Sequence, residues 1–343
     1  MASEASNRLG GGIGLLEAEG KIARIGVGWT DEGAMASNWN DKIRNALRSG
    51  VSTLREFAYP APARRNGSYN VRQALGVPRV GLALGGGFAR GIAHVGVLKV
   101  LCENRIPVDA LSGISAGSIV AAGFASGATP DEMAEAARRV RWNSFARWTV
   151  DRRGLATNGK MESMLRSLFH CSTFEELKKP LAVVATDIST GEAVVFNHGE
   201  LIPPLRGSCA YPGLFTPVAH QGRLLVDGAV SGPVPVAALR GLGVEKVIAV
   251  HFKANGLGHV PTNIFQVIGQ TFQIAENQIM STWRQHSDVV IEPEMNKFAW
   301  DDFDRVDEMI LVGENAAREM LPALRALIEP APEPAIVSIG PRS

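Results

Sequence analysis

Residues 79–125 read RVGLALGGGFARGIAHVGVLKVLCENRIPVDALSGISAGSIVAAGFA. The apolar run 79–84 ends at three glycines, and apolar residues then recur at helical spacing over 92–101. A second apolar run, 108–111, stops at Ser112, and a segment of small residues follows it. This order predicts strand, helix, strand and helix, which is the pattern of a parallel sheet with right-handed crossovers.

The same pattern continues towards the C-terminus. Four further apolar runs predict strands, with helical stretches between several of them: 181–185, 193–196, 224–226 and 247–250. We therefore predict a three-layer α/β/α domain over residues 79–310, with a mainly parallel central sheet. In such sheets the chemistry lies at the carboxyl ends of the strands, and the glycine clusters of this chain fall there.

The remaining segments have a different composition. Residues 1–78 are predicted to form an N-terminal extension with a basic amphipathic helix from Ser37 to Leu54 and a linker over 58–67. A helix docked on the main domain is favoured over a membrane-surface helix, because such apolar stripes usually face a core. Residues 311–330 are predicted as a C-terminal helical segment, and the proline-rich residues 331–343 as a disordered tail.

Composition restricts the partners. Lys and Arg total 35 against 34 Asp and Glu, so no global field favours nucleic acid or an anionic membrane. The three cysteines lie far apart without metal-site spacing, and we expect neither a metal nor a cofactor. No apolar run reaches bilayer-spanning length, and the first residues lack the features of a secretory signal. We expect a cytoplasmic protein whose membrane contact, where there is any, is local and peripheral.

The stretch Gly113-Ile114-Ser115-Ala116-Gly117 fits the GxSxG nucleophile elbow. This turn exposes a serine between a strand and a helix, and the glycines two residues on either side avoid collisions there. A predicted strand before the motif and a predicted helix after it supply the context that the motif requires. The alternative is a tight turn with an idle serine.

The second motif is the glycine-rich loop Gly85-Gly86-Gly87-Phe88-Ala89-Arg90-Gly91. Glycines leave backbone N–H groups unpaired close to a reacting atom, which suits an oxyanion hole. A dinucleotide-binding loop is the rival interpretation, because Asp109 lies at a suitable distance downstream. The GxGxxG pattern fails in both frames, since Arg90 and Phe88 stand where glycines are needed.

Two carboxylates are candidates for the base. Asp227, followed by Gly228, ends the apolar run 224–226, and Asp187 ends another apolar run in a comparable position. Spacing alone does not choose between them, and either could cap a turn.

Four motifs in a fixed order resemble the patatin-like phospholipase family, most closely its bacterial members. They are the glycine loop running into ARG (89–91) and HVGVL (94–98), GISAGS (113–118), YPGLFTP (211–217) and LVDGAVSGPVPV (225–236). The resemblance covers about residues 79–310. It implies a Ser115–Asp227 catalytic dyad and oxyanion donors from the loop formed by Gly85, Gly86, Gly87 and Phe88.

The resemblance also assigns lesser roles and shows one departure. Gly113 and Gly117 flank the nucleophile, while Arg90, Gly91 and Gly228 support the site. Many members of the family carry a further glycine where this chain has Phe88. Phe88 keeps a backbone N–H, so the oxyanion hole is expected to survive with a different shape.

The implied function is hydrolysis of lipid acyl esters through a covalent acyl-enzyme. A catalytically silent lipid-binding or regulatory module is the alternative, and a dinucleotide-binding protein is a weaker one. The motifs bind the carbonyl, so headgroup, chain length and positional preference stay open, as does the oligomeric state.

The proposed base raises a chemical difficulty, because an aspartate with an unperturbed pKa of about 3.9 is a poor base for an alcohol. A histidine would be an ordinary alternative, and His94 lies one helical turn beyond the glycine loop. A packed helix histidine is the favoured interpretation of His94, and nothing in the sequence places His198, His220 or His251 on the serine.

The segment 138–153 holds six arginines interleaved with Trp142, Phe145 and Trp148. An interfacial patch that engages lipid headgroups and acyl chains is one hypothesis, and a solvated helix face with core aromatics is the other. Cys209, close to the YPGLF segment, could line the pocket or simply be a small buried residue.

Overall fold

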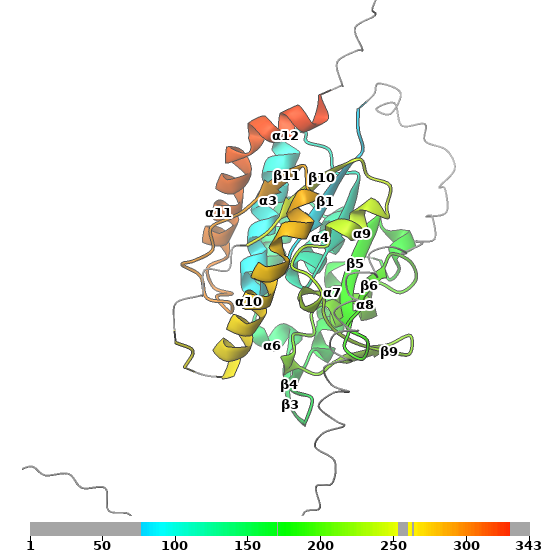
Figure 1. Cartoon of the computed structure of the whole chain (residues 1–343), viewed down its shortest axis with the longest axis vertical. Coiled ribbons are helices and arrows are strands. Elements are labelled where there is room, and N and C mark those ends of the chain that lie inside the picture. Colours follow the sequence, from blue (N-terminus) through cyan, green and yellow to red (C-terminus); the bar gives the residue numbers. More distant parts are fainter. Residues whose placement is uncertain (1–76, 170, 253–259, 263, 330–343) are drawn as a thin grey trace, which may run out of the picture. The chain divides into compact units, whose positions relative to one another are not determined.

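The computed structural model describes residues 77–169, 171–252, 260–262 and 264–329 (Figure 1). The predicted amphipathic helix, the linker and the C-terminal tail lie outside the described residues.

A mixed, mostly parallel sheet forms the centre of the described domain, and its strands follow the order β11-β10-β1-β2-β5-β9-β8, with β6 paired to β5. These strands are β1 (Val80–Leu84), β2 (Ala110–Gly113), β5 (Leu181–Asp187), β6 (Ala193–Phe196), β8 (Val218–His220), β9 (Arg223–Asp227), β10 (Lys246–Val250) and β11 (Val289–Ile291). The contiguous strands β11, β10, β1, β2 and β5 pair in parallel, while β6, β8 and β9 pair antiparallel to their neighbours.

Helices cover both faces of the sheet. They are α3 (Ala93–Glu103), α4 (Ala116–Ser126), α5 (Pro130–Arg139), α6 (Trp142–Phe145), α7 (Gly159–Leu168), α8 (Ile202–Ser208), α9 (Val236–Arg240), α10 (Ile264–Gln285), α11 (Val306–Glu319) and α12 (Leu321–Ile328). In β1, Leu82 and Leu84 pack in the core with α3 and α4, whereas Ala83 packs with α9. This alternation follows from the two-residue period of a strand and separates the two helical layers.

The predicted α/β/α fold is confirmed. All six predicted strands of the central sheet are present, and the break at Met320 separates α11 from α12, with Pro322 in the first turn of α12. The buried strands were recognisable because both of their faces are covered, so they read as continuous apolar runs.

A second, three-stranded sheet was not predicted. Its order is β3 (Arg147–Asp151), β4 (Gly154–Thr157) and β7 (Gly213–Phe215). The arginine-rich segment 138–153 is therefore not one solvated helix face, because α5 ends at Arg139 and the chain continues through α6 into a hairpin. Among the described residues no helix combines the length and hydrophobicity needed to cross a bilayer.

The pairing of β5 positions the candidate site. Ala185 pairs with both Val194 of β6 and Asp227 of β9, so β6 and β9 lie on opposite edges of β5. Val183 pairs with both Gly113 of β2 and a residue of β6, so β2 also lies opposite β6. Consequently β2 and β9 lie along the same edge of β5. Because β2 runs parallel to β5 and β9 runs antiparallel to it, the C-terminal ends of β2 and β9 face each other.

Candidate active site

Ser115 lies on a sharp turn between β2 and α4, and its backbone has φ +52° and ψ −131°. Such a conformation is strained for a residue with a side chain. The turn also forces close approach, because a Cβ on Gly113 would lie 2.4 Å from Ser118 Cα and one on Gly117 would lie 2.3 Å from Gly85 O. These contacts explain why both flanking positions are glycine.

Ser208 at the end of α8 stabilises this turn through hydrogen bonds. The Ser115 N–H donates to the Ser208 hydroxyl over 2.9 Å, and that hydroxyl donates to the Val184 carbonyl over 2.6 Å. The Ser118 hydroxyl adds a further hydrogen bond by donating to the Ser115 carbonyl over 2.6 Å. No motif in the sequence marks Ser208, because its role depends on where α8 meets β5.

Asp227 ends β9 on the edge of β5 that β2 also occupies, and it is buried. Its carboxylate accepts a hydrogen bond of 3.0 Å from the Ala229 N–H, and the Ser115 side chain lies near enough to influence its ionisation. Burial raises the pKa of Asp227 to about 7, against the opposing effects of the Ala229 N–H and the Ser115 side chain. A carboxylate with that pKa is a far better proton acceptor at neutral pH than an unperturbed aspartate.

Asp187, the other candidate, is held by different partners. Its carboxylate accepts from Arg223 over 3.1 Å and from the Ser189 N–H over 2.9 Å. These interactions lower the pKa of Asp187, with the Ser189 bond contributing most. The arrangement is that of a turn-capping ion pair.

The glycine loop lies beside the serine. A Cβ on Gly86 would stand 3.3 Å from Ser115 Cβ. Gly85 donates its N–H to Val250 O over 3.0 Å, whereas the N–H groups of Gly86, Gly87 and Phe88 make no backbone hydrogen bond to another described residue. The structure thus leaves the amides of Gly86, Gly87 and Phe88 without a backbone partner among the described residues and places Gly86 beside Ser115, while the amide of Gly85 is bonded to the sheet.

Phe88 adopts φ +51°, a left-handed conformation that favours glycine. Its ring makes edge contacts with Tyr211 and Trp300 at centroid distances of 5.2 and 5.1 Å. These contacts hold Phe88, which lines the same cavity as Ser115.

The supporting glycines are small for steric reasons. A Cβ on Gly91 would lie 2.5 Å from Ala116 Cβ, and one on Gly228 would lie 2.4 Å from Val184 O. Both residues therefore let neighbouring segments approach the elbow closely.

His94 supports the loop from behind. Its Nε2 donates to the Gly85 carbonyl over 2.9 Å, and its ring packs on Phe252 at 4.5 Å. Burial lowers the pKa of His94 to about 4, so the imidazole is neutral at physiological pH. The geometry agrees with the interpretation of His94 as a packed helix histidine.

The three other histidines that the sequence placed near strands or turns have partners elsewhere. His198 contacts Asn197, His220 packs on Phe196, and His251 lies 3.5 Å from Glu292. Among the described residues, no histidine is hydrogen-bonded to Ser115.

Sequence reasoning missed one charged residue of the site, Glu276 of α10. Burial first and Asp227 second raise the pKa of Glu276 to about 7, while Arg90 opposes the shift. Burial lowers the pKa of Arg90, and Glu276 is the main influence that opposes this change. The only sequence signal for Glu276 is that it ends an otherwise uncharged run from Ile264 to Ala275.

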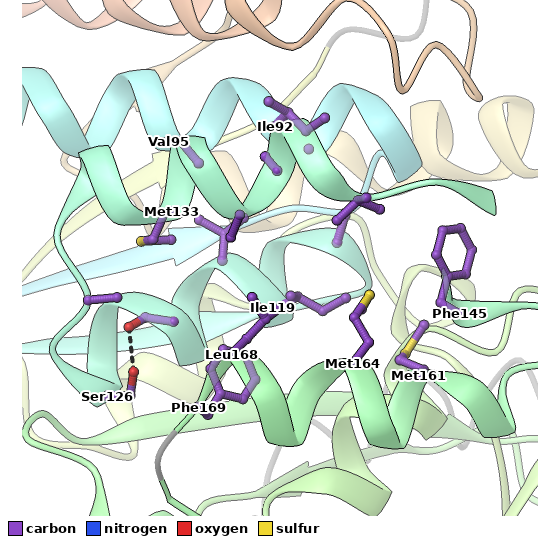
Figure 2. Close-up of a pocket in the computed structure, with 18 of the residues that line it drawn as sticks. Ile92, Val95, Ile119, Ser126, Met133, Phe145, Met161, Met164, Leu168 and Phe169 are labelled. Carbon is purple, nitrogen blue, oxygen red and sulfur yellow. Dashed lines mark hydrogen bonds between the residues drawn. The ribbon is translucent and has the colours of Figure 1, made fainter. Parts of the chain in front are cut away.

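An apolar cavity of about 710 Å³ opens beside Ser115 (Figure 2). It lies between α4, α5 and α7, and its lining includes Cys209, which is also buried. Burial raises the pKa of the Cys209 thiol, which keeps it neutral and apolar in character. No group of three or more metal-ligating side chains occurs among the described residues.

Residues 82–240 match the model of the family described as patatin-like phospholipase. The match identifies a patatin-like domain in this stretch of the chain. This domain contains the glycine loop, the elbow and Asp227. The family predicted from the four motifs is confirmed.

Relatives of this patatin-like protein include much longer chains. It is 34% identical over 202 residues to an uncharacterized NTE family protein of Mycobacterium tuberculosis, a match that covers 58% of this chain and 54% of the relative. It is 32% identical over 198 residues to the lysophospholipase nte1 of Aspergillus fumigatus, covering 56% of this chain and 13% of that one. The chain thus spans about half the length of the mycobacterial relative.

Among solved structures, the crystal structure of VipD from Legionella pneumophila aligns with a TM-score of 0.43 at 12% identity. The alignment covers 73% of this chain and 67% of VipD.

Proposed function

We propose that this protein hydrolyses carboxylic esters of lipids, with Ser115 as nucleophile and Asp227 as its acid/base partner. The observation that carries the proposal is that the ends of β2 and β9 bring the Ser115 side chain close to Asp227, a buried carboxylate whose pKa is raised to about 7. The family match and the lysophospholipase among the relatives support a lipid substrate.

In the first half-reaction, Ser115 Oγ forms a bond to the ester carbonyl carbon while its proton passes to Asp227. The amides of Gly86, Gly87 and Phe88 donate to the carbonyl oxygen as negative charge develops there, and one such donor is worth about 2.7 to 4 kcal/mol. The N-terminus of α4, which begins just after Ser115, adds a positive electrostatic potential. When the bond to the leaving alcohol breaks, that alcohol takes the proton from Asp227.

In the second half-reaction, water attacks the acyl-enzyme and gives a proton to Asp227. The bond between Ser115 Oγ and the acyl carbon breaks, and Oγ recovers the proton. The product is a free fatty acid, and the dyad returns to its starting state.

A fluorophosphonate probe tests the nucleophile. We expect it to label the protein and to lose that labelling in Ser115→Ala. Labelling that persists in the folded Ser115→Ala variant, or no labelling of the wild type, would contradict the proposal and favour a silent lipid-binding module.

The base is tested by a matched pair of variants. Asp227→Asn keeps an oxygen that accepts from Ala229, and we expect it to lower ester turnover by about 10²- to 10⁴-fold. Asp187→Asn at the other carboxylate serves as the control and should leave turnover nearly unchanged. Loss of turnover in Asp187→Asn alone would reject Asp227 as the base.

We also propose a peripheral contact with lipid surfaces through the β3–β4 hairpin and α10. Of the ten large apolar side chains that are exposed in the described part of the chain, seven lie on these segments or immediately before α10. They are Trp148, Val150, Leu155, Val260, Ile264, Val267 and Ile274. Of the three exposed arginines of the hairpin, Arg153 pairs with Asp151, and the other two, Arg147 and Arg152, would meet anionic headgroups.

A further inference from the structure

The cavity beside Ser115 follows one face of α4 from the beginning of the helix to its end. The lining positions of this segment recur at helical spacing: Ser115, Ala116, Ile119, Val120, Gly123, Ser126 and Gly127. A helix rises about 1.5 Å per residue, so the distance from Ser115 to Gly127 along the axis is roughly 18 Å. The cavity is therefore long, and the nucleophile stands at one end of it.

Apolar side chains of two other helices form the opposite walls. Figure 2 shows Met133 of α5 on one side and Met164 and Leu168 of α7 on the other, with Ser126 and Phe145 towards opposite ends. Methionine side chains adapt their shape to an apolar partner at low cost. The lining offers no carboxylate or ammonium group until the far end, where Glu132, Glu176 and Lys178 are exposed.

Gly123 marks an intermediate position along this cavity. A Cβ at this position would project towards the opposite walls, 3.3 Å from Met133 Cε and 3.5 Å from Phe169 Cε1. Gly123 lies roughly 12 Å from Ser115 along the axis of α4, given the same rise per residue. Any larger side chain here would therefore narrow the cavity at a defined distance from the nucleophile.

We propose that this cavity binds a single unbranched acyl chain along α4 and that Gly123 determines whether long chains fit. The inference rests on the proposed function, since it takes the ester carbonyl to lie at Ser115. An extended alkyl chain advances roughly 1.25 Å per carbon, given a C–C bond of about 1.52 Å and an angle near 111°. A chain from Ser115 reaches Gly123 after about 9 or 10 carbons and Gly127 after about 14, at about 1.5 Å of helix per residue.

The test compares Gly123→Leu with wild type on p-nitrophenyl octanoate and p-nitrophenyl palmitate. We expect the ratio of kcat/KM for palmitate over octanoate to fall by about tenfold or more, since a pocket discriminates strongly against groups that it excludes. Gly123→Ala adds only one methyl group beside the flexible end of Met133 and should give an intermediate change. It also guards against misfolding, because alanine is a better helix former than glycine.

Gly159→Leu is the matched control, because a Cβ on Gly159 meets nothing within 4 Å and Gly159 does not line the cavity. It should leave the ratio unchanged. An unchanged ratio in the folded Gly123→Leu protein would overturn the inference, as would equal losses for octanoate and palmitate.

A binding measurement separates this inference from the proposed function. Displacement of a fluorescent fatty acid by octanoate and by palmitate is followed in Ser115→Ala and in Ser115→Ala with Gly123→Leu. We expect the second substitution to weaken palmitate binding about tenfold or more while octanoate binding changes little. Ester turnover that survives in Ser115→Ala would reject the nucleophile, whereas palmitate binding that Gly123→Leu leaves intact would reject the acyl site.

Discussion

The N–H of Ser115 donates a hydrogen bond of 2.9 Å to the hydroxyl of Ser208, and this hydroxyl donates a second hydrogen bond to the carbonyl of Val184. One hydroxyl thereby satisfies a buried donor of the elbow and a buried acceptor of β5. We expect Ser208→Ala to reduce the free energy of unfolding by about 1 to 3 kcal/mol, because it leaves buried polar groups without partners. We also expect ester turnover to fall, since the position of Ser115 is no longer fixed.

Chemical denaturation and kinetics on the same preparation check this prediction. Ser287→Ala is a suitable control, because it removes a hydroxyl that donates to the Trp283 carbonyl far along the chain from the elbow. Equal effects of the two substitutions on turnover would contradict a specific role for Ser208.

Because the backbone of Ser115 is strained, replacing this residue with glycine should stabilise the fold relative to replacing it with alanine. Strain of this kind costs about 1 to 3 kcal/mol, and glycine adopts positive φ without that cost. We expect Ser115→Gly to be more stable than Ser115→Ala, with a higher Tm in differential scanning calorimetry. A lower Tm for the glycine variant would show that the turn is not strained in solution.

Ionisation of Asp227 should govern the pH dependence of activity. With a pKa of about 7, Asp227 loses its negative charge as the pH falls through that value, and kcat/KM should fall with it. The stability effect has the opposite sign: because the folded pKa is raised from 3.8, ionisation destabilises the fold as the pH rises towards and through about 7. Asp227→Asn should therefore be most stabilised relative to wild type above pH 7.

Titration of kcat/KM from pH 5 to 9, together with Tm over the same range, separates the two effects. Activity that stays constant down to pH 5 would be incompatible with Asp227 as the base.

Glu276 lies close enough to Asp227 for the two charges to repel each other. Glu276→Gln removes that repulsion and leaves Arg90 without its acidic neighbour, so ionised Asp227 becomes easier to form. We expect the acidic limb of the kcat/KM profile to move to lower pH in Glu276→Gln. Glu319→Gln, at an exposed position on α11, should leave the pH profile unchanged. A shift of equal size in Glu319→Gln would show that the effect is not specific to Glu276.

Trp142 of α6 and Trp148 of the β3–β4 hairpin should behave differently from each other. Trp142 stacks on Phe215 at 5.8 Å and contacts Phe145, both of which line the cavity, whereas Trp148 is 63% exposed. We expect Trp148→Ala to weaken sedimentation with anionic phosphatidylglycerol vesicles while the Tm changes little. Trp142→Ala should lower the Tm instead, because it leaves a gap in an aromatic cluster. Undiminished vesicle binding by Trp148→Ala would end the proposed role of the hairpin.

The sequence was sufficient for the central strands and the elbow because their signals are local. Leu82 and its neighbours form an uninterrupted apolar run, and Gly113 and Gly117 stand where a sharp turn requires them. The choice of Asp227 over Asp187 came from family resemblance, since both carboxylates end apolar runs. They differ in position, because Asp187 ends β5 itself whereas Asp227 ends β9 and pairs with Ala185 of β5. Pairing between distant strands has no local signature.

Other parts of the site depended on tertiary contacts for the same reason. Ser208 and Glu276 carry no motif, and their approach to the elbow is set by how α8 and α10 pack. The hydrogen bond from the Gly85 amide to Val250 likewise could not be predicted, because it depends on β10 being the neighbour of β1. The β3–β4 hairpin escaped prediction because arginines and exposed aromatics interrupt its alternation.

β5 contains neither Ser115 nor Asp227, yet it determines the distance between them. Gly113 lies opposite Val183 and Asp227 lies opposite Ala185, so one intervening residue, Val184, spans the gap between the two strand ends. Inserting a single amino acid there would move the ends apart by about 3.3 Å, more than the length of a hydrogen bond. During divergence of such domains, this strand should therefore accept changes of side chain far more readily than changes of length.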